Sequence, residues 1–336
     1  WRGNGLLSIT DPFGWGDEGT ILVSGAEGLA QARLSYSLPL GSGGLRGNLA
    51  YTAMRYELVG DLEALDGKGD AQTVNAWLSY PLIRRRTLSL TATIGYDFKA
   101  LTDELFGFTI RDKRVHAGNA GIAGSLADPW MAGGFSAWPL LATAGHLDLS
   151  GVKADERIDR LTSGAAGGFH RLNLAASRLQ RITDSLAGFV SYSAQFASGN
   201  LDSSEKMSLG GPYAVRAYPV GEASGDEAHL LTIEARQDLP FEWKAGTLQV
   251  SAFLDTGRVT LNKNPWPFAV QTLSGKNEYW LSGAGVGASL TREGRYFLRI
   301  NYAHRIGDND GRSLQGKDAD GRDASGRVWV IGQVSF

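Results

Sequence analysis

Residues 207–236 read MSLGGPYAVRAYPVGEASGDEAHLLTIEAR, and two kinds of sequence meet in this stretch. The first part lies in a long loop over 200–227 that is rich in glycine and acidic residues, with Arg216 at its centre. In the second part, polar Thr232, Glu234 and Arg236 alternate with apolar residues. A period of two predicts a β-strand with one polar and one apolar face.

The same alternation recurs through much of the chain. Residues 88–98 place Leu90 and Ile94 on an apolar face and Ser89 and Thr91 on a polar one. Equivalent patterns occupy Ala30–Leu38, Val74–Leu82, Leu186–Phe196, Leu248–Leu254, Tyr296–Tyr302 and Val328–Phe336. Aromatic residues gather near the ends of these segments, as they do in the interfacial girdles of membrane barrels. We therefore expect lipid contact for Leu34, Tyr36, Leu90, Ile94, Leu298 and Ile300, and an inner face that carries Arg33, Ser89, Thr91, Arg299 and Asn301.

The composition narrows the class of protein. The chain has 45 glycines in 336 residues, no cysteine and a net charge of −2. No apolar run approaches the roughly 18 residues of a membrane helix, which excludes a helical bundle in the membrane. A membrane barrel remains possible because only every second residue of its strands faces lipid. The near-neutral charge gives no reason to expect nucleic-acid binding, and no signal peptide is visible at Trp1, so we expect a mature chain or part of a longer one.

The connections between the segments fall into two classes. The short ones are Pro12–Asp17, Gly41–Gly44, Arg84–Arg86, Ala132–Gly134, Thr183–Ser185, Phe241–Gly246 and Glu293–Arg295. The long polar ones are Asp61–Asp70, Val152–Gly168, Asn200–Glu227, Lys263–Asn277 and Gly307–Gly326. Short turns that alternate with long loops are typical of outer-membrane barrels, with the long loops at the cell surface. A soluble β-sandwich also alternates, but its loops have no reason to sort by length.

These patterns predict an all-β fold, a transmembrane antiparallel β-barrel over 1–336. About fifteen strands can be counted, and single-chain bacterial barrels have even strand numbers. An open barrel would also leave unpaired backbone groups in lipid, at several kcal/mol each. We therefore expect sixteen strands, with the first before Trp1 or at the start of the chain.

The sequence of the loop resembles a motif of a known family. The run GGPY-x-VRAYP, followed by GD and E-x-R, is similar to the sixth-loop motif of the outer-membrane assembly and secretion superfamily. It resembles most the two-partner secretion transporters of the haemolysin-activator (TpsB) type. Fainter matches lie in Asp11–Asp17, Ser79–Arg86 and Phe253–Gly257. The motif residues are Gly210, Gly211, Val215, Arg216, Ala217, Tyr218 and Pro219; the superfamily pattern has glycine at the position of Ala217, where a positive φ would strain alanine.

The resemblance also implies a partner for Arg216. In the strand Leu248–Asp255 the alternate apolar residues face one way; they are Leu248, Val250, Ala252 and Leu254. Asp255 therefore faces the opposite, polar side. In the family, the loop arginine pairs in the barrel lumen with the aspartate of an F-x-D-x-G strand, here Phe253, Asp255 and Gly257. Without the resemblance, the simpler interpretation is that both groups are solvated. A bidentate pair would fix the loop to the barrel wall.

Other charges have two interpretations. Glu234 and Arg236 lie on one strand face, and Arg33, Lys99, Arg171, Arg178 and Arg299 are expected on other inner faces. They could form a polar conduit for an unfolded polypeptide or a salt-bridge lattice that stiffens the barrel. The residues themselves do not choose between these two.

The sequence gives no sign of an enzyme, a cofactor or a metal site. Five histidines are scattered without metal-binding spacing, and there is no G-x-S-x-G or P-loop motif. Asp308-x-Asp310 and Asp318-x-Asp320 resemble calcium ligands only faintly, because the EF-hand spacing and its glutamate are missing. We expect a solvated acidic loop there.

The resemblance implies an outer-membrane pore of a Gram-negative bacterium that secretes an unfolded partner exoprotein of the adhesin or haemolysin type. POTRA modules would precede this segment, which shows no αβ pattern of that kind. The alternatives are an insertase of the same superfamily and a passive porin. Expected partners are the exoprotein, outer-membrane lipid and the barrel-assembly machinery, since the chain ends on an alternating strand with Val334 and Phe336.

Overall fold

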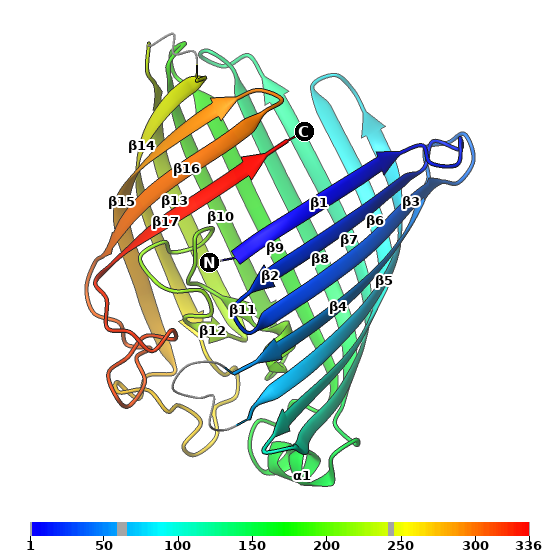
Figure 1. Cartoon of the computed structure of the whole chain (residues 1–336), viewed down its shortest axis with the longest axis vertical. Helices are drawn as coiled ribbons and strands as arrows, with labels where there is room; N and C mark the ends of the chain where they lie inside the picture. The colour runs from blue at the N-terminus through cyan, green and yellow to red at the C-terminus, as the bar shows by residue number, and fades with distance from the viewer. Residues whose placement is uncertain (1, 59–65, 241–244, 336) are drawn as a thin grey trace. The chain divides into compact units, whose positions relative to one another are not determined.

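The alternating segments are neighbouring strands of one antiparallel sheet. A computed structural model describes residues 2–58, 66–240 and 245–335. Its described residues form a fifteen-stranded sheet in the order β1 to β10 and then β13 to β17, so each strand pairs with its chain neighbour. Figure 1 follows this order from β1 in blue to β17 in red. The sixteenth strand stays a prediction.

The strands have these bounds: β1 Arg2–Thr10, β2 Glu18–Ala26, β3 Leu29–Pro39, β4 Arg46–Glu57, β5 Lys68–Arg84, β6 Leu88–Leu105, β7 Phe108–Asp128, β8 Gly134–Asp148, β9 Gly167–Arg181, β10 Leu186–Ala197, β13 Glu227–Asp238, β14 Thr247–Thr260, β15 Glu278–Arg292, β16 Tyr296–Arg305 and β17 Gly326–Val334. A small second sheet pairs β11 (Met207–Ser208) with β12 (Ser224–Gly225). One α-helix, α1, spans Lys153–Leu161, and a 3-10 turn spans Ser203–Glu205. No helix among the described residues is both long and apolar enough to cross a membrane.

Internal contacts divide the chain into two compact units. Unit 1 comprises Trp1–Arg85, Ser89–Ala123 and Leu141–Arg171. Unit 2 comprises Arg86–Leu88, Gly124–Leu140 and Leu172–Phe336. The Arg216 loop and the strands that contact it belong to unit 2.

The two faces of the strands differ in exposure as their alternation predicts. Leu34 and Ile94 are 52% and 63% exposed, whereas Glu234 and Asp255 are 6% and 0% exposed. This is the reverse of a soluble protein, in which apolar side chains are buried and charged ones lie outside. Tyr36 and Leu90 are half-buried. Asn301, expected on the inner face, is buried, and its Oδ1 lies 2.3 Å from where a Cβ on Gly287 would be.

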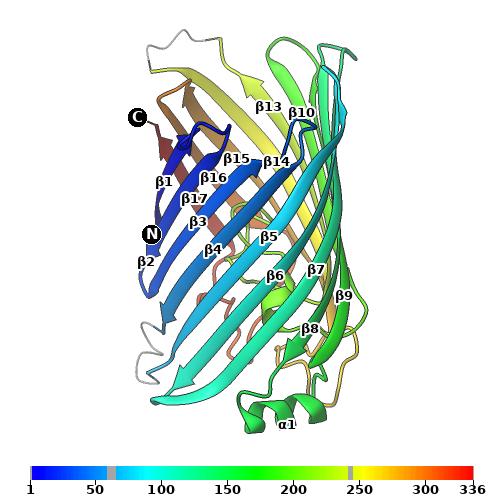
Figure 2. The same cartoon turned by 90° about the vertical axis from the view of Figure 1, so that its right-hand side faces the viewer.

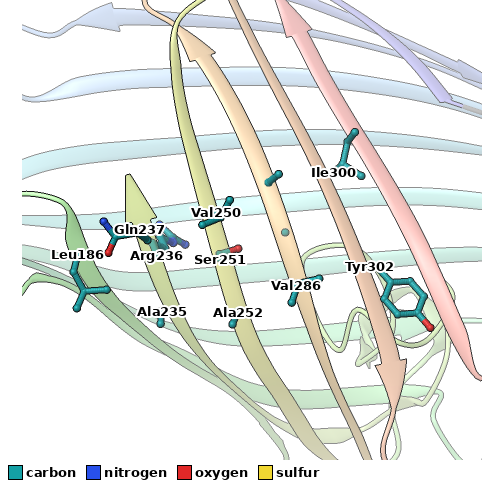
Figure 3. A pocket seen from close by; sticks show the side chains of 12 residues that line it. Leu186, Ala235, Arg236, Gln237, Val250, Ser251, Ala252, Val286, Ile300 and Tyr302 are labelled. Carbon is teal, nitrogen blue, oxygen red and sulfur yellow. The ribbon is translucent and has the colours of Figure 1, made fainter. Parts of the chain in front are cut away.

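A hollow of about 670 Å³ lies along the exposed apolar face of β10 and β13 to β16 (Figure 3). The strand register sets Ala235 opposite Ala252, and Ala252 opposite Val286. Val286 in turn lies opposite Tyr302. The hollow forms where alanine side chains extend only a short way from the backbone. The exposed face here is apolar, as lipid contact requires.

The sorting of connections by length is incomplete. Two connections where the alternation predicts long loops are two-residue turns, Glu27–Gly28 and Phe106–Gly107. Phe106 and Gly107 both have positive φ (51° and 76°), the backbone of a type I′ hairpin turn. Phenylalanine is an unusual residue for that conformation, so the sequence carried no turn signal there.

The loop predicted over Val152–Gly168 contains helix α1, which the sequence reading missed. Asp155 and Glu156 lie in its first turn and Arg160 in its last, which suits the helix dipole. Figure 2 shows α1 next to the end of β8. The bounds of the loop predicted over Asp61–Asp70 differ, because β4 ends at Glu57 and β5 already begins at Lys68. Residues 61–65 of that loop, 241–244 of the turn Phe241–Gly246, and Phe336 lie outside the described residues.

The turn over Pro12–Asp17 is organised by one buried carboxylate. Asp17 Oδ1 accepts the backbone N–H groups of Phe13 and Trp15, and Oδ2 accepts the Tyr36 hydroxyl at 2.6 Å. Burial by itself would raise the pKa of Asp17, but these hydrogen bonds to its charged form, led by that of Tyr36, hold the pKa below its ordinary value.

Candidate functional site: the Arg216 loop

The loop between β10 and β13 is folded onto the sheet rather than extended into solvent. Strands β11 and β12 close its base, and they lie against β13 and β14 (Figure 1). Leu209, Val215 and Tyr218 are fully buried in one cluster with Phe253 and Leu281. Each such side chain contributes about 1.5–3 kcal/mol when it is removed from water. Apolar burial therefore holds the loop on the same strand face that carries Asp255.

Arg216 meets two carboxylates at this face. Its Nε donates to Asp255 Oδ2 at 2.8 Å and its Nη2 to Asp255 Oδ1 at 2.9 Å, a bidentate pair. Its Nη1 donates to Glu234 Oε2 at 2.9 Å, and its backbone N–H donates to Asp255 Oδ2 at 3.1 Å. The structure thus brings together Arg216 and Asp255, the two residues of the predicted pair, and adds Glu234 as a third member.

The guanidinium is enclosed on its remaining sides. It lies over the ring of Phe253 with its carbon 3.2 Å from the ring centroid, a cation–π arrangement. Trp329 Nε1 of β17 donates to the Arg216 carbonyl at 2.7 Å. Arg216 is only 5% exposed. Burial alone lowers the pKa of Arg216, but the hydrogen bonds and charges of Asp255 and then Glu234 outweigh it and raise the pKa, so the side chain stays charged.

The two carboxylates have further partners. Asp255 Oδ1 also accepts the Thr232 hydroxyl at 2.9 Å, and Glu234 Oε1 accepts Arg236 Nε at 2.9 Å. Arg236 lies over the ring of Phe189 at 4.5 Å. Glu234 therefore binds two guanidinium groups, one from the loop and one from its own strand. Two positive and two negative charges balance within the cluster.

The glycines of both motifs occupy positions where a side chain would collide. A Cβ on Gly210 would lie 2.0 Å from the Pro219 carbonyl oxygen, and Gly211 has φ of 129°. A Cβ on Gly257 would lie 2.8 Å from a backbone oxygen and 3.0 Å from the Leu209 side chain. Glycine at these three positions lets the loop turn tightly and approach β14.

Ala217 is accommodated without strain. It is fully buried, and its φ is not positive. Its Cβ lies against Gly283 of β15, where a second Cβ would come within 2.5 Å. Alanine therefore fits here because the facing strand supplies the glycine.

Comparison with known proteins assigns the family. The model of the haemolysin secretion/activation proteins ShlB/FhaC/HecB matches residues 1–290. The chain belongs to this family. The heme/hemopexin transporter protein HuxB of Haemophilus influenzae is 30% identical over 307 residues, which cover 90% of this chain and 53% of HuxB. The chain thus spans about half the length of the curated relatives it matches.

Solved structures agree on the fold of this ShlB/FhaC/HecB family member. CdiB from Escherichia coli matches 99% of this chain and 59% of its own with a TM-score of 0.78 at 19% identity. BamA from Haemophilus ducreyi, lacking POTRA domains 1-3, matches 98% of this chain and 67% of its own with a TM-score of 0.64 at 10% identity. The prediction of a transmembrane antiparallel β-barrel in the outer membrane of a Gram-negative bacterium is confirmed. The family is one of secretion channels rather than enzymes.

The other charged residues predicted on inner faces have contacts of their own, and of these Arg299 lies near enough to interact electrostatically with Glu234, Arg236 and Arg216. Arg33 of unit 1 donates to Thr52 at 3.0 Å and to Asn75 at 3.3 Å. Arg178 of unit 2 binds Asp128 through two nitrogens at 2.9 and 3.1 Å. Arg299 stacks over Phe297 at 5.2 Å. Lys99 and Arg171 belong to unit 1 and so lie outside the unit that holds the site.

The prediction of a solvated acidic loop over 307–326 is wrong for its central residues. Asp318 and Asn309 are buried, and Asp318 pairs with three arginines, of which Arg327 is nearest at 3.0 Å. The carboxylate of Glu222, in the Arg216 loop, accepts hydrogen bonds from this connection. Sequence reasoning missed Glu222, Asn309, Thr232 and Trp329 because their partners are remote along the chain.

Proposed function

We propose that this chain is the barrel portion of a two-partner secretion transporter, the pore through which an unfolded exoprotein crosses the outer membrane. Membership in the haemolysin secretion/activation family supports this, as does a relative that is named as a transporter. The observation that carries the proposal is the loop held at a buried Arg216–Asp255–Glu234 cluster. In this proposal the loop is a movable element, and this cluster is the charged contact that holds it in place.

In this proposal residues 1–336 form the pore, and the loop over 200–227 folds into the lumen at rest. The polar inner face, with Glu234 and Arg236, offers a passing polypeptide hydrogen bonds without a large apolar surface. The exoprotein folds after it emerges, and that folding gives the transport its direction, since the periplasm supplies no ATP. POTRA modules, which recognise the exoprotein, belong to the remainder of a longer protein, in keeping with the half-length match to HuxB.

The proposed partners are a secreted exoprotein of the adhesin or haemolysin type, the surrounding lipid, and the barrel-assembly machinery that inserts the chain. The alternative function as an insertase rests on the likeness to BamA, which at 10% identity concerns the fold alone. The family match favours secretion over both the insertase and a passive porin.

The test begins with a search beside this gene for one that encodes a large repetitive exoprotein, and then measures secretion of that exoprotein in the culture medium and at the cell surface. Deletion of the full-length protein should abolish secretion, and the wild-type protein should restore it. Arg216→Ala should restore it poorly at an unchanged level in the outer membrane. Arg258→Ala is the control, because Arg258 pairs with Glu278 at the exposed surface. Normal secretion in the deletion strain would refute the proposal.

A further inference from the structure

A carboxylate of the Arg216 loop itself, six residues after Arg216, is buried against another connection. Glu222 lies on the same loop and is only 2% exposed. Its Oε1 accepts the Asn309 side-chain amide at 2.9 Å, and its Oε2 accepts the Ala319 backbone N–H at 2.7 Å. Both donors belong to the connection between β16 and β17. Both oxygens of this side chain are therefore bound by one other connection of the same unit.

The connection that binds Glu222 is itself fixed to the strands. The Asn309 amide also donates to Asp318 Oδ1 at 2.9 Å. Asp318 pairs with Arg327 at 3.0 Å, and Arg305 and Arg312 approach it at 3.8 and 3.7 Å. Arg305 ends β16 and Arg327 lies at the start of β17. The group that holds Glu222 is thus a charged cluster anchored at two strand ends.

Glu222 is also tied to the turn that carries Arg216. Its carbonyl oxygen accepts the backbone N–H groups of Leu209 and Gly210, both at 3.1 Å. The next residue, Ala223, has φ of 52°, so the backbone leaves the turn in a left-handed conformation. A movement of the connection between β16 and β17 that displaced Glu222 would therefore act directly on the turn around Arg216.

We propose that Glu222 is a second positioning residue of the loop, which couples its release to opening of the connection over 306–325. The Arg216 contact fixes the loop to β13 and β14, and the Glu222 contact fixes it to that connection. The loop leaves the sheet only when both contacts open. This rests on the proposed function for its meaning in transport, but the two contacts can be tested without secretion.

The absence of cysteine from the chain allows a direct measurement. Val215→Cys places a thiol of similar size in a fully buried position of the loop. Its rate of reaction with a maleimide, in the purified full-length protein in liposomes, measures how often the loop leaves the sheet. Native folding of each variant is checked by its heat-dependent mobility in gels.

Glu222→Gln and Asn309→Ala, each added to Val215→Cys, should both raise the labelling rate by about tenfold or more. Glutamine presents a donor where the carboxylate accepted an N–H, and alanine removes the amide donor. Because both changes break the same Asn309–Glu222 hydrogen bond, the labelling rate of the combined variant should exceed that of the faster single variant by no more than about twofold. The control is Asp308→Asn in the same connection, whose side chain is exposed; it should stay within about twofold of the parent.

Labelling at the parent rate in Asn309→Ala or Glu222→Gln would overturn the proposal. So would rates that multiply fully in the combined variant, because Glu222 would then act without Asn309. If Glu222→Gln does not fold, Asn309→Ala alone decides. Exoprotein secretion is measured in parallel: faster labelling without any dependence of secretion on this protein would refute the proposed function and leave the second contact standing.

Discussion

Arg216→Ala should undock the loop while the barrel stays folded. The substitution removes three side-chain hydrogen bonds and the stacking on Phe253. Asp255 would keep the Thr232 hydroxyl and the backbone N–H of residue 216 but would lose its counterion. Glu234 would still be paired with Arg236. The strand ladders do not involve this side chain, so insertion in the membrane should be unaffected.

The magnitude follows from the burial of the pair. Removing one partner of a buried ion pair costs about 3–5 kcal/mol, because the other charge is left without compensation. We take the low end, about 3 kcal/mol, since two donors remain on Asp255 and one cation remains on Glu234. At about 1.4 kcal/mol for each factor of ten, this corresponds to roughly a hundredfold shift of the docking equilibrium. Arg216→Lys keeps the charge but not the bidentate geometry, so we expect an intermediate shift of about tenfold.

The assay is the maleimide labelling of Val215→Cys in liposomes, where the rate follows the population of undocked loop. Arg216→Ala should label roughly a hundred times faster than the parent. Arg258→Ala serves as the control, because an ion pair at an exposed position contributes about 0–1 kcal/mol. An Arg216→Ala rate within about threefold of the parent, roughly 0.6 kcal/mol, would refute the argument. A Lys variant equal to the parent would show that charge alone, and not the bidentate contact, holds the loop.

Three further predictions concern the strands and a turn. Leu298→Arg should lower the stability of the barrel by about 2–4 kcal/mol in denaturant unfolding, whereas Arg299→Leu on the opposite face should cost about 1 kcal/mol or less; equal losses would contradict the assignment of faces. Gly283→Ala should undock the loop in the labelling assay because its Cβ would meet Ala217, while Gly19→Ala, with no described atom within 4 Å of the new Cβ, should leave the rate unchanged. Asp17→Asn should destabilise the protein near neutral pH, and its effect should shrink as the pH falls below about 3.9, because a carboxyl whose pKa is lowered by folding contributes stability above its unfolded pKa and loses it as the pH falls through the lowered value. An effect of Asp17→Asn in thermal unfolding that does not shrink with falling pH would exclude that linkage.

The period of two predicted most of the sheet because each strand faces two different environments. Leu34 and Ile94 are exposed on one face and Asp255 is buried on the other. Apolar and polar residues alternate along the strands in keeping with this contrast. The phase of the strand placed Asp255 on the polar face, and the family resemblance supplied its pairing with Arg216. The two-residue turn at Phe106 and Gly107 was not predicted, because phenylalanine rarely adopts the left-handed backbone that Phe106 has here.

The remainder of the site depends on contacts between distant parts of the chain. Glu222 binds Asn309 and Ala319, 87 and 97 residues away, and Trp329 reaches Arg216 from the last strand. Local pattern carries no information about such pairs. The acidic connection over 307–326 was therefore predicted to be solvated. Folding instead places arginines from two strand ends around Asp318.

The sharing of Glu234 between two arginines has a consequence for ions. With the loop docked, Arg216 and Arg236 neutralise Asp255 and Glu234. When the loop departs it takes the Arg216 charge away from these carboxylates, so the wall of the proposed pore becomes more negative, although Arg299 stays nearby. A more negative lining favours cations. The open pore should therefore be more cation-selective than the resting one, and a shift of reversal potential in a salt gradient would report the position of the loop.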